Sequence, residues 1–245
     1  MKLKQLACLA VLTTPFTANA DFLSVTAGGG VWNTSPDGNF QTTSDPIAVD
    51  IKDNLFWDDE SQGYLFVTFE HFVPLIPNVK IIHTSIDQDG SGNTTFEFNG
   101  QPFNGDISNK FAIDTTDLIL YYEVLDNVVS LDIGLNIRNL KVDYIITNSD
   151  TNTTEEDSFN ETVPMLYALV GVTPWPDVII SGEMSYIAFD GSSISDITAK
   201  IAYTTDFFVG FEAGYRMQEY EFDDISDTDA DLSFDGIFAG AYLKF

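Results

Sequence analysis

The amino-acid sequence predicts an all-β protein, folded as a closed antiparallel transmembrane β-barrel of about ten strands. Apolar and polar residues alternate with a period of two through most of the chain, as they do in strands with two different faces. The connections between these strands alternate between short turns and longer acidic loops. Aromatic residues gather near the strand ends, where the two interfaces of a bilayer would meet the barrel.

The alternation is clearest in four segments, at residues 128–138, 178–189, 195–205 and 207–218. In the third segment Ile197, Ala199 and Ile201 lie on one face of the strand, opposite the polar Thr198 and Lys200. A soluble β-sandwich alternates in the same way. The lengths of the connections and the aromatic residues near the strand ends distinguish the two folds, and both favour the membrane barrel.

The connections have the arrangement of outer-membrane barrels, with short periplasmic turns and longer acidic extracellular loops. Short joints fall at 74–77, 126–127, 174–177 and 205–206, and longer polar ones at 34–61, 88–108, 148–157 and 222–230, with 190–193 as a short exception. The predicted strands are therefore 22–33, 62–73, 78–87, 109–125, 128–147, 158–173, 178–189, 194–205, 207–221 and 231–245.

One predicted strand, at 128–147, changes the parity of its apolar residues after Ile137. The apolar residues occupy odd positions before this point and even positions after it. Two explanations are open: a β-bulge near Asn139, or a strand that rises beyond the membrane.

The two ends of the chain predict export and assembly. Residues 1–20 read as a signal peptide, with Lys2 and Lys4 before a short apolar core and small residues before Asp21, so that residues 21–245 form the barrel domain. The last predicted strand ends on Phe245 in a row of alternating apolar residues. Because a bilayer leaves no sheet edge unpaired, this strand has to close the barrel against the first one. A terminal aromatic residue of this kind resembles the signal that the barrel-assembly machinery recognises.

The composition excludes several classes of protein. A formal net charge of -28 makes nucleic acid a poor partner, since nucleic-acid binding depends on neutralising phosphates. A hydrophobic content of 44% excludes a disordered acidic chain. No stretch reaches 18 apolar residues, so transmembrane helices are excluded. We expect a monomer whose acidic loops attract divalent cations, which could bridge to lipopolysaccharide and the outer-membrane lipid.

A calcium site is one hypothesis for the segment "DQDGSGNTTFEF". Asp87, Asp89, Ser91 and Asn93 occupy positions 1, 3, 5 and 7, which match the oxygen spacing of an EF-hand loop. The twelfth position is Phe98 rather than the bidentate Glu of that motif. The alternative is an ordinary surface loop built from glycines and short polar residues.

Charged residues on the predicted inward faces form a second candidate site. The interior of a barrel of this size is close to filled by side chains, and unpaired buried charge is costly, so we expect a salt-bridge plug. A narrow ion path is the alternative. The residues are Glu70, Glu123, Asp132, Arg138, Glu183, Lys200, Glu212, Arg216 and Lys244.

The segments "GGGVWNTSPDG", "FVTFEHFVPLIPNVKI", "LILYYEVLDNVVSLDIGL", "FEAGYRMQEYEFDD" and "DLSFDGIFAGAYLKF" resemble a family of small proteobacterial outer-membrane β-barrel proteins. The resemblance runs over nearly the whole of residues 21–245. It implies the fold and a location in the outer membrane of a Gram-negative bacterium, and it implies no chemistry.

The sequence contains no constellation that predicts catalysis. The two histidines are His71, near a predicted periplasmic turn, and His83, in mid-strand. No Cys or His cluster suggests zinc or haem, and no other cofactor is expected. We therefore expect a structural or surface-interaction barrel with a filled lumen rather than an enzyme. The alternatives are a narrow passive channel and, less favoured, a surface enzyme that uses His83 or loop acids.

Overall fold

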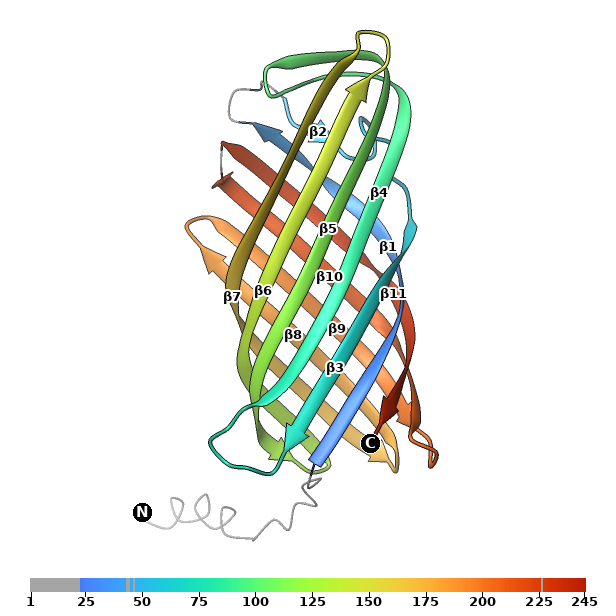
Figure 1. Cartoon of the computed structure of the whole chain (residues 1–245), viewed down its shortest axis with the longest axis vertical. Helices are drawn as coiled ribbons and strands as arrows, with labels where there is room; N and C mark the ends of the chain where they lie inside the picture. The colour runs from blue at the N-terminus through green and yellow to red at the C-terminus, as the bar shows by residue number, and fades with distance from the viewer. Residues whose placement is uncertain (1–22, 43–44, 46, 226) are drawn as a thin grey trace, which may run out of the picture.

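The computed structural model describes residues 23–42, 45, 47–225 and 227–245 as one antiparallel barrel (Figure 1). The expected signal peptide and its cleavage site lie outside the described residues. The strands are β1 (Leu23–Thr42), β2 (Val49–Asp50), β3 (Glu60–His71), β4 (Asn78–Phe98), β5 (Gln101–Asp126), β6 (Val129–Asn148), β7 (Thr153–Trp175), β8 (Val178–Phe189), β9 (Ser192–Thr204), β10 (Val209–Ile225) and β11 (Thr228–Lys244). Among these residues no helix has the length and apolar character needed to cross a bilayer.

The barrel closes where β11 pairs with β1. Each other long strand pairs with its neighbours in chain order, apart from the place where β3 follows β1, because β2 is only two residues long and pairs with the outer end of β1. Ten long strands therefore form the ring, and β2 is an addition to it. The predicted all-β closed barrel of about ten strands is confirmed, and the two-residue β2 brings the number of described strands to eleven.

Several strands extend far beyond their predicted ends. The predicted loops at 88–108 and 148–157 are mostly paired strand, and the turn between β4 and β5 is reduced to Asn99 and Gly100. Both residues have positive φ, 53° and 68°, as a tight hairpin turn requires. Short polar residues alternate along these extensions, so their composition resembles that of loops although their backbones pair.

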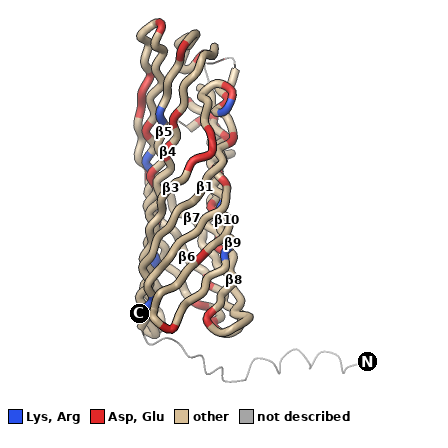
Figure 2. The backbone as a smooth tube through the Cα atoms, turned by 90° about the vertical axis from the view of Figure 1, so that its right-hand side faces the viewer, with Lys and Arg blue, Asp and Glu red and all other residues tan. Residues whose placement is uncertain are grey.

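The lengthening divides the barrel into a lower half, with an apolar outer surface and a polar lumen, and an upper or outer half, with a polar outer surface and an apolar interior. In β6, Ile133, Leu135 and Ile137 face outward and are exposed, whereas Leu140 and Val142 face inward and are buried. The register of β6 with β5 and β7 runs through Asn139 without a shift, so no bulge lies there. The strand instead rises out of the apolar band, where the outer face becomes polar and the interior becomes apolar. Figure 2 shows many of the acidic residues along this half, which lies far from the C-terminus.

The segment between β1 and β3 folds into the upper half rather than forming a polar loop. Val49, Ile51, Leu55 and Trp57 are buried in the main hydrophobic cluster of the upper half. The Trp57 indole donates a hydrogen bond to Asn109 Oδ1 at 2.7 Å, which ties the segment to β5. This segment and the inward side chains of the long strands together form the core of the upper half.

Candidate functional site

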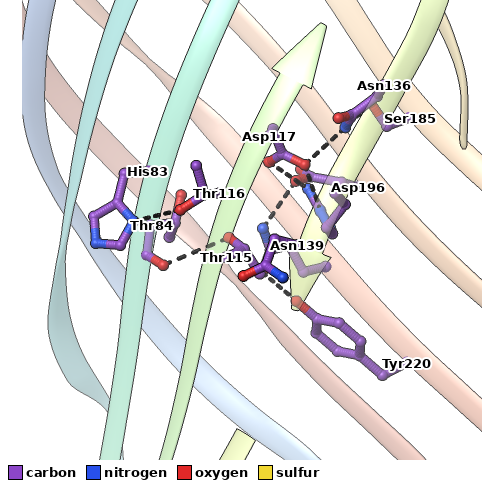
Figure 3. Close-up of polar contacts among 12 residues, drawn as sticks. His83, Thr84, Thr115, Thr116, Asp117, Asn136, Asn139, Ser185, Asp196 and Tyr220 are labelled. Carbon is purple, nitrogen blue, oxygen red and sulfur yellow. Dashed lines mark hydrogen bonds and ion pairs between the residues drawn. The ribbon is translucent and has the colours of Figure 1, made fainter. Parts of the chain in front are cut away.

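The lumen of the lower half contains a buried ionic cluster. At its top Arg138 on β6 forms two hydrogen bonds with Asp117 on β5, at 2.7 and 2.9 Å, and one with Asp196 on β9, at 2.5 Å. Figure 3 shows Asp117 and Asp196 next to each other. Arg216 on β10 forms two more with Asp196, at 3.0 and 2.7 Å. Asp196 thus bridges the two guanidinium groups, and four strands are joined across the lumen.

Aromatic and polar side chains enclose this cluster. The guanidinium of Arg216 lies 5.0 Å from the centre of the Trp32 ring, in cation–π geometry. Gln218 donates a further hydrogen bond to Asp196 at 2.8 Å, and Arg216 donates one to Thr84 at 3.0 Å. Each charged group therefore has several partners, as buried charge requires.

Two further ion pairs lie below this cluster. Lys80 contacts Glu183 at 2.5 Å, and Lys200 contacts Glu212 at 3.0 Å. Together with the upper cluster, four basic groups face four acidic groups in the lumen. The charges balance, so this part of the lumen has no net charge that would attract ions of one sign.

A row of four residues on adjacent strands crosses the seam where the barrel closes. Tyr64 is opposite Gly30, Gly30 is opposite Gly240, and Gly240 is opposite Glu212. The Tyr64 hydroxyl reaches over both glycines and donates a hydrogen bond to Glu212 Oε1 at 2.7 Å. A Cβ atom on Gly240 would lie 2.3 Å from that hydroxyl, so the glycine is needed for the contact.

A small cavity remains among these side chains, with a volume of about 60 Å³. Arg138 Nη1 and Asn136 Oδ1 belong to residues that line it, and both atoms are buried without a hydrogen-bond partner. One is a donor and the other an acceptor, so a few water molecules would satisfy both. The cavity is too small for a solute of appreciable size.

The structure brings only part of the predicted lumen set together. Arg138, Glu183, Lys200, Glu212 and Arg216 take part in the ion pairs. The other members lie lower: Glu70 accepts a hydrogen bond from Tyr121 at 2.9 Å, Glu123 is opposite Asp132, and Lys244 ends β11 opposite Thr26.

Sequence reasoning missed three members of the ionic cluster, namely Lys80, Asp117 and Asp196. A signal for Asp196 was available, since it lies on the same face of its strand as Lys200. Asp117 likewise lies on the same face of its strand as Glu123, but its pairing with Arg138 follows only from the register, in which the two residues are directly opposite. Register between strands is a property of the pairing and is not visible in one strand alone.

The segment proposed as a calcium loop is not a loop. Asp87, Asp89, Ser91 and Asn93 lie on β4, paired in register with β5, and their side chains point away from the barrel. Alternate residues of a strand are spaced along it, whereas an EF-hand loop wraps its oxygens around one ion. In the part of the chain that the structure describes, no group of three or more His, Cys, Asp or Glu residues could hold a metal ion. The expectation of an EF-hand-like loop is therefore wrong.

The histidines lie outside the lumen cluster. His83 Nδ1 is 3.1 Å from Thr116 Oγ1 on the outer face of β4 and β5, and the next pair on that face joins Ser85 to Asp114 at 2.6 Å. His71 accepts a hydrogen bond from the backbone of Val73 near the turn that follows β3. The hydrogen bond of His83 thus goes to a hydroxyl rather than to a carboxylate.

No protein-family model matches the chain, and no curated protein sequence is similar to it. Among solved structures, the outer membrane protease OmpT from Escherichia coli matches with a TM-score of 0.56 and 9% identity over 94% of this chain and 98% of that chain. The transport unit of the autotransporter AIDA-I from Escherichia coli matches with a TM-score of 0.41 and 8% identity over 96% and 93% of the two chains. A major outer membrane protein from Thermus thermophilus matches with a TM-score of 0.39 and 11% identity over 91% of this chain and 99% of that chain. The likeness to OmpT shows a shared barrel fold and nothing about activity.

Proposed function

We propose that the protein is an integral β-barrel of the Gram-negative outer membrane whose lumen is closed by its own side chains and whose outer half serves surface interactions. The apolar outer face of the lower half supports membrane insertion. It presents exposed apolar side chains on several strands, including Leu65, Val67, Ile133, Leu135 and Ile237. Contact of such a band with water is unfavourable, whereas contact with the hydrocarbon core of a bilayer is favourable.

The filled lumen is the observation that supports closure. The lower half contains the balanced ionic cluster, and the upper half contains an apolar core that includes the folded-in segment around Trp57. Any ion that crossed would have to break several buried charge-assisted hydrogen bonds and then pass through apolar packing. The cavity of about 60 Å³ among the ion pairs of the lower half is too small to provide such a path.

Recording from planar bilayers tests closure. Purified protein is expected to give no single-channel steps, while an open porin in the same bilayers gives them. Insertion is checked separately by the different gel migration of boiled and unboiled samples. Regular conductance steps from correctly inserted protein would contradict the closed lumen and favour the narrow passive channel, the second candidate, which the polar lining of the cavity supports.

The expected partners follow from the location. The apolar band contacts outer-membrane lipid, and the acidic outer half meets lipopolysaccharide through divalent cations, which offset the repulsion between two negative surfaces. The barrel-assembly machinery would act on the closing strand that ends at Phe245. A monomer is the proposed state, because among the described residues each long strand is paired on both sides within the apolar band.

A further inference from the structure

The outer part of β7 has an unpaired edge. β7 pairs with β6 from Thr153 to Val172, but its pairing with β8 begins only at Leu166. The β8–β9 hairpin turns at Asp190 and Gly191, and β7 continues above it (Figure 1). Over residues 153–165 the described part of the chain therefore offers β7 no second strand. A row of backbone amides and carbonyls is left available on that side.

This edge is strongly acidic. Residues 153–163 include Glu155, Glu156, Asp157 and Glu161, and the chain has no Lys or Arg between Lys141 and Lys200. Most side chains of this stretch are exposed. Charged residues on an edge discourage pairing with other acidic or apolar strands, and they leave a basic strand as the favoured partner.

The acids are arranged by face. Glu155 is opposite Ile146, Asp157 is opposite Tyr144, and the β6 partners face the interior. Residues that are directly opposite lie on the same face of the sheet, so these acids also face inward, next to the apolar core. The pKa of Tyr144 supports this placement, because burial and then Asp157 and Glu155 raise it to about 12.

Phe159 and Glu161 continue the same inward row. Phe159 is opposite Val142 and Glu161 is opposite Leu140, whose side chains are buried, while Phe159 itself is 40% exposed. The row along the free edge is therefore acid, acid, aromatic, acid, at every second residue. An added strand would meet these four side chains with its own alternate residues.

A second copy of this chain does not fit the edge. Two such edges paired with each other would place acids against acids, and like charges directly opposite destabilise a sheet. The net charge of -28 adds to the repulsion. The fitting partner is an extended segment with basic residues at alternate positions.

We propose that the free edge of β7 binds an extended basic segment of a partner protein as an additional antiparallel strand, with basic side chains facing Glu155, Asp157 and Glu161. The residue of the segment that faces Phe159 is apolar. Hydrogen bonds between the backbones of β7 and the bound segment set the register, and the alternating side chains of β7 select the sequence of the segment. The inference deepens the proposed function, because it places the surface interaction at one edge of the outer half.

A synthetic peptide with blocked ends, Lys-Thr-Phe-Thr-Lys-Thr-Lys, is the probe, and its affinity is measured for protein inserted in vesicles of zwitterionic lipid. The matched peptide carries N-methyl groups on alternate backbone amides, which keeps the charge and removes the ladder donors. We expect the N-methylated peptide to bind at least about fivefold more weakly. Isotope-edited infrared spectra should show the labelled carbonyls of the parent peptide in β-sheet geometry.

Two protein variants separate the edge from general acidity. The edge variant is Glu155→Gln, Asp157→Asn and Glu161→Gln. The control is Asp223→Asn, Asp224→Asn and Asp227→Asn, which removes three exposed charges at the end of β10 and just after it. The edge variant should weaken binding at least about fivefold and the control less than about twofold.

Equal binding of the two peptides, or equal loss in the two variants, would overturn the proposal and leave adsorption to an acidic surface. Gel migration of unboiled samples verifies that every variant is a folded barrel. The bilayer recordings do not depend on the peptide, so a failure of the closed-lumen proposal is recognised separately from a failure here.

Discussion

Tyr64 and Glu212 are 148 residues apart in the chain, and the Tyr64 hydroxyl donates a hydrogen bond to Glu212 at 2.7 Å across the seam of the barrel. Glu212 also accepts from Lys200 at 3.0 Å. The contact therefore connects the closing strands to the ionic cluster. It exists because Gly30 and Gly240 leave the space between the two side chains.

Replacing Gly30 by alanine tests the seam. The added Cβ would lie 2.2 Å from the carbonyl oxygen of Ala239 and 2.7 Å from the Tyr64 hydroxyl, so backbone and side chain both have to move. We expect the free energy of unfolding to fall by about 1–3 kcal/mol. Denaturant unfolding in lipid vesicles measures it. Gly63→Ala is the control, since no heavy atom lies within 4 Å of its added Cβ, and a similar loss in both variants would contradict the account of the seam.

Removing the charge of Asp196 tests the ionic cluster. Asp196→Asn leaves Arg138 and Arg216 facing each other with one shared acid fewer, and an uncompensated buried charge costs about 3–5 kcal/mol of stability. Asp143→Asn removes an acid from an exposed pair with Lys141, where a loss below about 1 kcal/mol is expected. The loss in each variant is measured from the midpoint of denaturant unfolding, provided that the dependence of the unfolding free energy on denaturant is the same in both variants. If Asp196→Asn unfolds like the wild type, the cluster does not contribute to stability as described.

The docking of the segment before β3 should depend on pH through Asp45. Burial acts to raise the pKa of Asp45, but hydrogen bonds from Thr42 and from the backbone of Gly100 and Asn99 outweigh it and lower the pKa below the ordinary 3.8. A lowered folded-state pKa means that this stabilisation is present above about pH 4 and is lost as the pH falls through the folded-state value.

Hydrogen exchange between pH 3 and 6, corrected for the intrinsic pH dependence, measures this docking. Protection of the amides of Asn99 and Gly100 is expected to fall at the acid end in the wild type. In Asp45→Asn it should already be reduced at pH 6, with little further change. Ser149, whose amide bonds the backbone of Asp106 at 2.9 Å in the next hairpin, is the internal control. A wild-type profile that stays flat for Asn99 and Gly100 would contradict the role of Asp45.

Deleting Phe245 tests the closing strand as an assembly signal. The backbone of Phe245 exchanges two hydrogen bonds with Val25, at 2.9 and 3.0 Å, and its ring stacks on Phe208. We expect the deletion to lower the amount of heat-modifiable protein in the outer-membrane fraction several-fold. Phe207→Ala removes an exposed ring at the same end of the barrel and should have little effect. Normal assembly of the deletion variant would contradict the role of Phe245 in assembly but not the barrel fold.

The parity change in β6 shows how much of the fold can be predicted from the sequence. The switch after Ile137 is visible in the residue pattern, and it marks the level at which the strand leaves the apolar band. The sequence alone left a bulge as an alternative, since a bulge also shifts parity. Only the uninterrupted pairing of β6 with β5 and β7 excludes the bulge.

The extended hairpin of β4 and β5 was missed although a signal for it exists. Asn99-Gly100 is the preferred dipeptide of a two-residue hairpin turn, and Phe96 and Phe98 alternate with polar residues before it. The acids and glycines at 87–93 resemble a loop by composition. Pairing with β5 overrides that tendency, because β-propensity is set largely by the neighbouring strand.

The residue pattern alone predicts the fold class, the residues of each strand that face the lumen, and the closing role of the last strand. These follow from local alternation and from the rule that a bilayer leaves no sheet edge unpaired. The partners in the lumen, the folding of the segment around Trp57 into the barrel, and the free edge of β7 become visible only in the folded protein. Those depend on register and on strands far apart in the chain, and a period of two specifies which face a residue occupies but not which residue lies across from it.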